Sequence, residues 1–452
     1  MIIPRSKLLL WVALILVPFS LLGAAEPRLA WFAFSVMGVF GLLAVVDAFR
    51  GWPLLNGLHV ECPKITRMSR ERAGKIEVRI RNPRPDSMAV TIGLAFPREL
   101  ETDEGELSVS LPADSEWSRL EWPCRPLKRG RLQVPTAHLE ATSPLGFWGL
   151  RKSVPVGAEI RVYPNLLAER RNLAALFLNR GSFGLHAQRQ LGKGREFEKL
   201  REYVPGDGYD ELHWKATARR GRPITKVYQI ERTQEVYVVI DASRLSARSA
   251  PVDASEETGE APEQTTSLER FLTASLVLGL AAEQQGDLFG LLTFSDKVDR
   301  FLRARNGKTH YNACRDAIYT LDPRIVTPDY DELCSFIRLR LRRRALLIFL
   351  TSLDDPVLAE SFVRNMDLIR RQHLVMVNMI QPAGVEPVFT NPNIATTDQL
   401  YEHLAGHMQW HQLRELEKVL QRRGVNFALL KNERLATSLV AQYLNVKRRQ
   451  AL

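Results

Sequence analysis

Three histidines in this 452-residue sequence have a spacing that could bind a metal. His403, His407 and His411 recur every four residues, which would place them along one face of a helix. Imidazoles at this spacing can chelate zinc, but the sequence has no H-E-x-x-H pattern and no cysteine close to them. We therefore interpret the three histidines as an exposed helix face and keep zinc binding as the alternative.

The tripeptide Gly307-Lys308-Thr309 resembles the end of a phosphate-binding loop. Such a loop needs a glycine five positions before Gly307, and Leu302 stands there. The preceding run also indicates an edge strand, whereas these loops follow a central strand. No G-x-S-x-G pattern supplies a hydrolase nucleophile either. The sequence thus predicts neither ATP binding nor an enzyme.

The four cysteines do not form a recognisable site. No C-x-x-C pair occurs, which argues against a zinc ribbon, a redox dithiol or a disulfide framework. We expect them to be small buried side chains in a reducing compartment. They are Cys62, Cys124, Cys314 and Cys334.

The net charge of +11 favours anionic partners, and its densest part is an arginine-rich run over residues 338–344. The run ends an expected helix, where cations complement the helix dipole. Contact with anionic lipid is the alternative. Nucleic-acid binding is not predicted, because neither aromatic interleaving nor a known motif accompanies the charge.

The elements that position these residues begin with two apolar runs, residues 8–25 and 29–48. Each is long enough to cross a hydrocarbon layer of ~30 Å, and only three residues separate them, so they predict a transmembrane hairpin over residues 1–50. Cationic residues flank both outer ends, which predicts cytoplasmic termini and the bacterial inner membrane. A signal peptide cleaved after Ala25 and a buried soluble hairpin are the alternatives.

Two kinds of pattern follow the hairpin. Residues 51–165 alternate apolar and polar side chains between proline-rich turns, which predicts a small β-sandwich. Residues 166–233 are irregular and charged. Residues 234–452 alternate apolar strands with helical patterns, which predicts an α/β domain with a doubly wound, mostly parallel sheet. Within it, the acidic, Ser/Thr/Pro-rich residues 247–267 predict a disordered insert.

Two charged blocks lie at short separation in the segment before the α/β domain. Residues 194–207 read G-R-E-F-E-K-L-R-E-Y-V-P-G-D, and residues 212–221 read L-H-W-K-A-T-A-R-R-G. These blocks closely resemble the signature of the bacterial "domain of unknown function 58" family. The resemblance implies two N-terminal spans, a β-rich domain, a domain similar to the von Willebrand factor A type, and partnership with MoxR-type AAA+ ATPases. Asp210-Glu211 departs from the family, which usually carries a basic residue there.

The resemblance to A-type domains also implies a divalent cation at the carboxyl edge of the sheet. The family motif is Asp-x-Ser-x-Ser, joined by a threonine and an aspartate from later loops. Leu245 and Ser352 stand where the second serine and the aspartate are expected. Mg²⁺ is therefore a candidate at a degraded motif, and a polar strand-end cluster that orders loops is the alternative. The candidate ligands are Asp241, Ser243, Thr309 and Asp354.

The signature blocks themselves predict a docking surface for an acidic protein. They interleave cations and carboxylates around the turn at residues 205–208. An internal salt-bridge network is the alternative, because mixed-sign runs are often solvated faces. The residues expected to bind a partner are Arg201, Asp207, Trp214, Lys215 and Arg219.

Together these patterns predict a membrane-tethered, non-enzymatic adaptor that presents the sheet rim to a MoxR-type AAA+ ATPase or its client. A self-assembling envelope protein is the first alternative. A metal-dependent enzyme is the second, and the incomplete metal motif counts against it.

Overall fold

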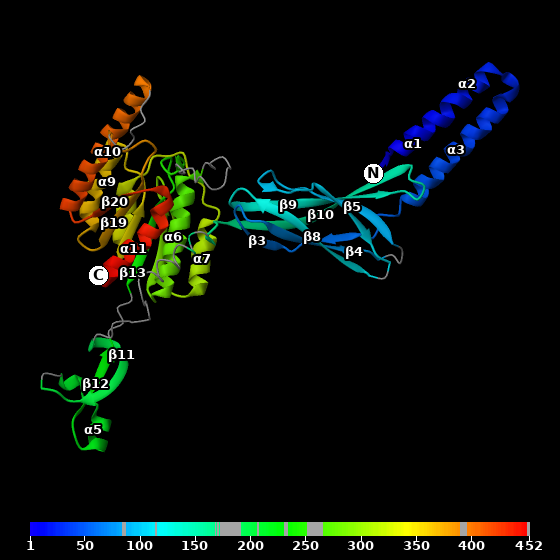
Figure 1. The fold of residues 1–452 in the computed structure, drawn as a ribbon. Helices are drawn as coiled ribbons and strands as arrows, with labels where there is room; N and C mark the ends of the chain where they lie inside the picture. The colour runs from blue at the N-terminus through cyan, green and yellow to red at the C-terminus, as the bar shows by residue number, and fades with distance from the viewer. Residues whose placement is uncertain are drawn as a thin grey trace. The chain divides into compact units, whose positions relative to one another are not determined.

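The structure, a computed structural model, describes residues 1–83, 87–113, 115–167, 169, 171, 191–205, 208–229, 234–250, 265–388 and 396–449 (Figure 1). The chain divides into two compact units, Met1–Asn165 and Leu166–Leu452.

The first unit opens with two apolar helices, which confirms this part of the expected fold. The first run, Ser6–Ala25, comprises α1 (Ser6–Trp11), a π-helical segment (Val12–Leu16) and α2 (Val17–Ala25). The second comprises a 3-10 turn (Pro27–Leu29) and α3 (Ala30–Gly51). Figure 1 shows α2 and α3 side by side. Their mean hydropathies are 2.4 and 2.3 and they are 6% and 17% buried, so both could span a membrane by length and composition.

The rest of the first unit is sandwich-like, as expected, and consists of two sheets. One has the order β1-β10-β9-β5-β7, with β3 parallel to β10, and the other the order β2-β4-β8-β6. Alternate side chains of both sheets point into one shared core that includes Val78, Ile92, Trp122 and Val162. The strands are β1 (Ile2–Pro4), β2 (His59–Glu61), β3 (Ile65–Ser69), β4 (Gly74–Arg81), β5 (Met88–Leu94), β6 (Leu100–Glu101), β7 (Glu106–Leu111), β8 (Trp117–Pro126), β9 (Gly130–Thr142) and β10 (Trp148–Tyr163).

A buried carboxylate joins the helical hairpin to the sandwich. Asp47, near the end of α3, is 1% exposed. Its carboxylate accepts hydrogen bonds from Ser143 Oγ at 2.6 Å and from the amides of Leu145 and Phe147 at 2.9 and 3.3 Å. Trp148 Nε1 donates to the carbonyl oxygen of Ala44 at 2.8 Å. The loop between β9 and β10 is therefore fixed to the end of α3.

The second unit contains a six-stranded mixed sheet of order β17-β16-β13-β18-β19-β20. The four pairings from β16 to β20 are parallel, whereas the edge strand β17 runs antiparallel to β16. The sequence predicted a mostly parallel sheet, and the antiparallel edge makes it mixed. The strands are β13 (Glu235–Asp241), β16 (Leu288–Phe294), β17 (Val298–Arg305), β18 (Leu346–Leu350), β19 (Leu374–Ile380) and β20 (Asn426–Leu430).

β13 and its parallel neighbours carry apolar side chains on both faces. Helices therefore cover both faces of this sheet. Val236, Val238 and Ile240 pack under α6, α7 and α11, while Tyr237 and Val239 pack under α8, α9 and α10. Figure 1 shows these helices around the sheet. Their bounds are α6 (Ser267–Gln284), α7 (Lys308–Ile318), α8 (Tyr330–Arg340), α9 (Pro356–Ile369), α10 (Thr397–Arg422) and α11 (Leu435–Arg448), with a 3-10 turn (Asn432–Arg434) before α11.

Two further pieces belong to the second unit. β11 (Leu191–Glu202) and β12 (Ile224–Gln229) form an antiparallel hairpin that encloses a 3-10 turn (Tyr209–Glu211) and α5 (Trp214–Arg220). β14 (Ser249–Ala250) pairs with β15 (Thr265–Thr266), so the two ends of the expected acidic insert meet. Residues 251–264 of that insert lie outside the described residues.

Candidate functional site

Asp241 lies at the carboxyl end of the central strand β13 and is fully buried. One of its oxygens accepts a hydrogen bond from the amide of Ser243 at 2.8 Å, and the other accepts one from Thr351 Oγ1 at 2.6 Å. The Oγ of Ser243 in turn accepts from the amide of Leu245 at 3.3 Å. This aspartate and serine therefore order the turn that follows β13 and connect it to the end of β18.

The hydroxyl of Tyr330 extends this buried network. It lies 3.3 Å from Thr351 Oγ1. Burial raises the pKa of the Tyr330 phenol, and the nearby carboxylates of Asp241, Asp354 and Asp355 raise it further. Burial likewise raises the pKa of Asp241, against the opposing effect of its hydrogen bonds. The carboxyl edge thus gathers several acidic groups near one phenol.

Arginines pair with two of the aspartates at this edge. Arg248 forms an ion pair with Asp354, and Arg324 Nη1 lies 2.9 Å from Asp299 Oδ1. Asp355 caps α9 by accepting from the amide of Val357 at 3.0 Å. The sequence analysis did not identify these arginines, since nothing local relates Arg248 to a residue 106 positions away.

Thr309 does not join this group. It is exposed at the start of α7, directly after β17. Because β17 is antiparallel, its end at Arg305 pairs with Phe289 near the start of β16, at the amino edge of the sheet. Asp241 pairs with Phe294 at the opposite end of the same strand. The threonine expected from the A-type motif is therefore separated from Asp241 by the length of β16.

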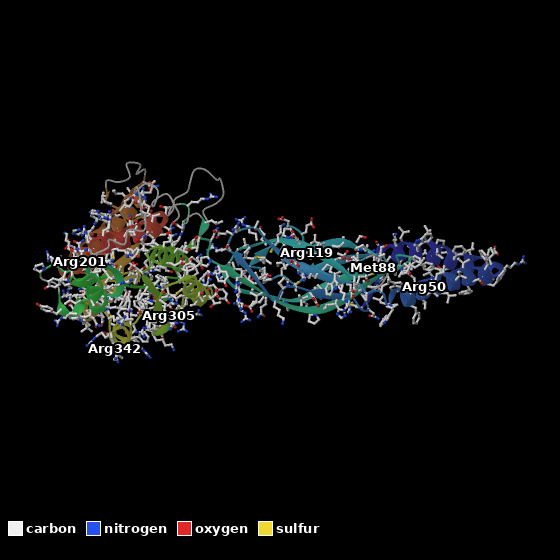
Figure 2. The ribbon with its side chains drawn as sticks, turned by 90° about the horizontal axis from the view of Figure 1, so that it is seen from below. Arg50, Met88, Arg119, Arg201, Arg305 and Arg342 are labelled. Carbon is white, nitrogen blue, oxygen red and sulfur yellow. The ribbon has the colours of Figure 1, made fainter. Side chains whose placement is uncertain are left out.

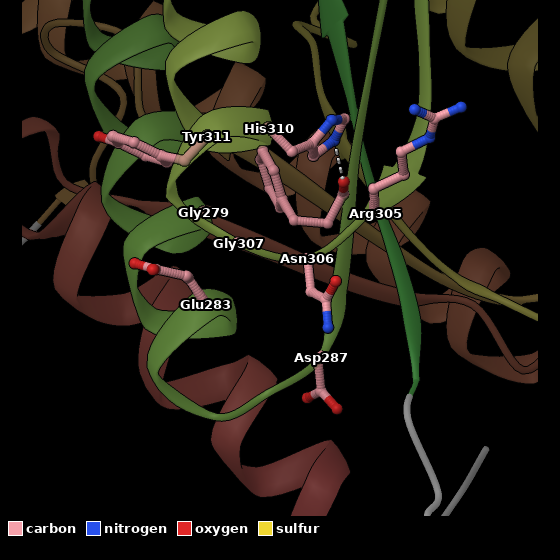
Figure 3. Close-up of a pocket in the computed structure, with 9 residues that line it drawn as sticks. Gly279, Glu283, Asp287, Arg305, Asn306, Gly307, His310 and Tyr311 are labelled. Carbon is pink, nitrogen blue, oxygen red and sulfur yellow. Dashed lines mark hydrogen bonds between the residues drawn. The ribbon is translucent and has the colours of Figure 1, made fainter.

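Figure 3 shows Gly307 and His310 around a small cavity that is also lined by Asp287, the residue before β16. His310 Nε2 lies 2.8 Å from the carbonyl oxygen of Phe289. The cavity that they line measures about 10 Å³, which is room for a single water and not for a phosphate.

The residues at the carboxyl edge fit a Mg²⁺ ion poorly. Mg²⁺ takes about six oxygen ligands in near-octahedral geometry. Both Asp241 oxygens already accept hydrogen bonds, and Arg248 holds one oxygen of Asp354. Asp354 Oδ1 is buried with no hydrogen-bond partner. Of the four expected ligands, the structure brings Asp241 and Ser243 together, places Asp354 near Tyr330, and leaves Thr309 at the other edge.

The three histidines of α10 are not arranged around a common point. The ring of His407 stacks on Trp410 at 5.8 Å, and His411 is exposed. Among the described residues, no three His, Cys, Asp or Glu side chains are grouped as a metal site.

A second candidate site is the helix α5 inside the β11–β12 hairpin. His213 caps its start by accepting from the amide of Ala216 at 3.0 Å, and Gly221 ends it in the left-handed conformation (φ +66°) that glycine adopts without strain. Thr217 Oγ1 accepts from the amide of Ile224 at 3.0 Å, which holds the helix against β12. The second signature block therefore forms a short helix fixed at both ends.

One surface of this helix is aromatic and cationic. Trp214 is 68% exposed, and Lys215, Arg219 and Arg220 are exposed beside it. We call these four residues the α5 surface. In the part of the chain that the structure describes, no acidic side chain forms an ion pair with its three cations. Arg222 and Glu202, in the same hairpin, form an ion pair at 2.5 Å.

The remaining residues of the expected docking surface lie elsewhere in the hairpin. Arg201 is partly buried near the end of β11 and is not part of the α5 surface. Asp207 lies outside the described residues. Tyr209, which the sequence analysis did not single out, is 78% exposed and stacks on Tyr203 at 6.5 Å. The sequence signal for this exposed ring was the presence of an aromatic residue close to the Pro-Gly turn.

The comparisons with known proteins concern this same region. The family model described as "Protein of unknown function DUF58" matches residues 199–387, which begin in β11 and include α5 and most of the sheet. This match supports the family resemblance. Comparison with curated proteins gave no match.

Solved structures give only distant likenesses. The PilB minor pilin from Streptococcus sanguinis is 11% identical, with 79% of this chain and 88% of that chain covered, at a TM-score of 0.31. An uncharacterized membrane-spanning protein from Vibrio fischeri is 12% identical, with 48% of this chain and 98% of that chain covered, at a TM-score of 0.17. Scores this low do not establish a shared fold.

Proposed function

We propose that the chain is a membrane-tethered adaptor that binds a partner protein through the α5 surface. The observation that supports this is the exposure of Trp214 beside three cations that no described carboxylate neutralises. Exposed tryptophan and arginine are the side chains that most often contribute large shares of binding energy at protein interfaces. The capped, hydrogen-bonded helix holds them in place, which reduces the entropy lost on binding.

The chemistry of the α5 surface suits a partner with acidic groups around an apolar pocket. Its cations attract carboxylates and raise the rate of encounter, while the indole of Trp214 needs a pocket to be desolvated. The family resemblance makes a MoxR-type AAA+ ATPase our first candidate. We propose that the adaptor acts with it in maturing or assembling client proteins, and has no catalytic activity of its own.

We further propose that the α/β unit is related to von Willebrand factor A domains and has lost the metal-dependent version of their rim. This proposal is supported by the ion pair between Arg248 and Asp354 and by the hydrogen bonds that both Asp241 oxygens accept. The cations flanking the two apolar helices favour the bacterial inner membrane with the rest of the chain in the cytoplasm.

A capture experiment tests the adaptor proposal. The tagged full-length chain is solubilised in detergent from its own cells, and the bound proteins are identified by mass spectrometry. The docking variant combines Trp214→Ala with Arg219→Glu. The control combines Trp117→Ala in the sandwich with Arg364→Glu on α9, which changes an exposed tryptophan and an exposed arginine outside the α5 surface.

We expect the wild type and the control to recover a MoxR-type ATPase and the docking variant to recover much less. Equal recovery by all three would remove the α5 surface from the proposal. Recovery of this chain's own copies without any ATPase would favour a self-assembling envelope protein instead.

A further inference from the structure

A group of exposed arginines lies at the amino edge of the sheet, far from the carboxyl-edge cluster. Arg338 and Arg340 end α8, and Arg342 and Arg343 follow it. The exposed Arg303 and Arg305 end the neighbouring strand β17. The rings of Phe301 on β17 and Phe336 on α8 pack at 5.4 Å, which places the two ends together. Figure 2 shows Arg305 and Arg342 along the same border of the unit.

The loop that presents these arginines is held in one conformation. Gln372 Nε2 donates to the carbonyl oxygens of Leu341 and Arg342, at 3.0 and 2.9 Å. The side chain of Leu341 is 4% exposed and anchors the loop in the core. The guanidinium of Arg340 lies over the ring of Phe336 at 5.7 Å.

These cations are not neutralised within the described chain. No described carboxylate pairs with Arg338, Arg340 or Arg342, and Arg343 reaches Glu235 only at 3.9 Å. At the carboxyl edge, by contrast, Arg248 and Arg324 both pair with aspartates. The helix dipole explains cations in the last turn of α8, but not those that follow the helix or end a strand.

An exposed leucine lies among the arginines. The side chain of Leu339 is 76% exposed. An apolar side chain surrounded by arginines suits the boundary between headgroups and acyl chains, and the planar guanidinium forms paired hydrogen bonds with phosphate oxygens. The same chain carries two helices long and apolar enough to cross a membrane, and a chain tethered by them stays close to a phosphate-rich surface.

We propose that this amino edge binds the headgroups of anionic phospholipids, with Leu339 entering the bilayer surface and the six arginines contacting phosphate groups. This function rests on the proposed membrane tether but uses a surface separate from α5, so it does not depend on docking through α5.

The test places an environment-sensitive fluorophore at Leu339→Cys in the full-length chain, reconstituted in nanodiscs. The matched control is Val357→Cys on α9, which is 75% exposed and lies at the carboxyl edge. Both are made in a Cys62→Ser background, because the other three cysteines are buried. The discs contain phosphatidylcholine alone or mixed with phosphatidylglycerol, and a lipid-borne spin label serves as quencher.

We expect a blue shift and quenching at position 339 only in discs with phosphatidylglycerol, reversed by high salt, and no change at position 357. Replacing Arg338, Arg340 and Arg342 together with Gln should abolish the response. Equal signals in the two lipids, or at the two positions, would overturn the proposal. So would loss of the signal on adding inorganic phosphate or duplex DNA at matched ionic strength, because either would show that the edge prefers a soluble phosphate ligand.

Discussion

Asp241 and Thr351, 110 residues apart in the sequence, are joined by a 2.6 Å hydrogen bond between the ends of two adjacent strands. Thr351 Oγ1 donates to a carboxylate oxygen that is removed from solvent. The bond connects the turn after β13 to the loop that leads into α9, so the carboxyl edge is stabilised by internal hydrogen bonds and ion pairs.

Removing this donor should destabilise the α/β unit. In Thr351→Val, the buried Asp241 Oδ2 loses its hydrogen-bond donor. We expect the free energy of unfolding to fall by about 1–3 kcal/mol. Thr309→Val, at the exposed start of α7, should change stability by less than about 0.5 kcal/mol. Chemical denaturation of the detergent-solubilised chain compares the two. A Thr351→Val protein as stable as the Thr309→Val control would contradict the assigned hydrogen bond.

Mg²⁺ should not stabilise the protein. The oxygens of Asp241 accept from Ser243 and Thr351, and Arg248 pairs with Asp354, so few oxygens remain for a divalent cation. We expect the midpoint of thermal unfolding to be the same with Mg²⁺ and with EDTA. A midpoint raised by Mg²⁺ in the wild type but not in Asp354→Asn would show a working metal site.

Acid should weaken the fold through His373. This residue is 3% exposed, neither ring nitrogen has a hydrogen-bond partner, and burial lowers its pKa. Below an ordinary pKa of about 6.5, the unfolded chain binds a proton that the folded chain does not, so stability falls as pH falls. We expect His373→Leu to lose less of its thermal stability between about pH 8 and about pH 5.5 than the exposed-site control His411→Leu. Identical pH profiles for the two variants would exclude His373 as the cause.

The Asp47 junction should control the order of the loop between β9 and β10. In Asp47→Leu the amides of Leu145 and Phe147 lose their acceptor. We expect their hydrogen exchange to accelerate about 10-fold or more. The control Glu26→Leu, at the exposed turn between the two apolar helices, should leave these amides unchanged. Unchanged protection in Asp47→Leu would mean that the loop is ordered by other contacts.

Local sequence patterns predicted the element types well, because helices and strands each produce a short-range periodicity of apolar residues. The apolar runs expected at residues 8–25 and 29–48 are observed as the helices Ser6–Ala25 and Pro27–Gly51, and the edge strand expected before Gly307 is observed as β17. The two apolar helices needed only length and composition.

The candidate sites were less predictable, because they depend on strand direction and long-range contacts. Thr309 follows a strand as the motif requires, but β17 runs antiparallel and carries it to the opposite edge. Asp47 was visible only as a charge at the end of an apolar run, since its partners are 96 or more residues away. The exposure of Trp214 follows from the hairpin that encloses α5, which the charged segment did not predict.

The most direct test of the adaptor proposal is photo-crosslinking from the α5 surface. A photoreactive amino acid replaces Trp214 or, as the control, the exposed Trp117 of the sandwich, and the full-length chain is irradiated in intact cells. We expect an adduct with a MoxR-type AAA+ ATPase from position 214 and none from position 117. The absence of any protein adduct at position 214, or the same adducts from both positions, would contradict docking through α5.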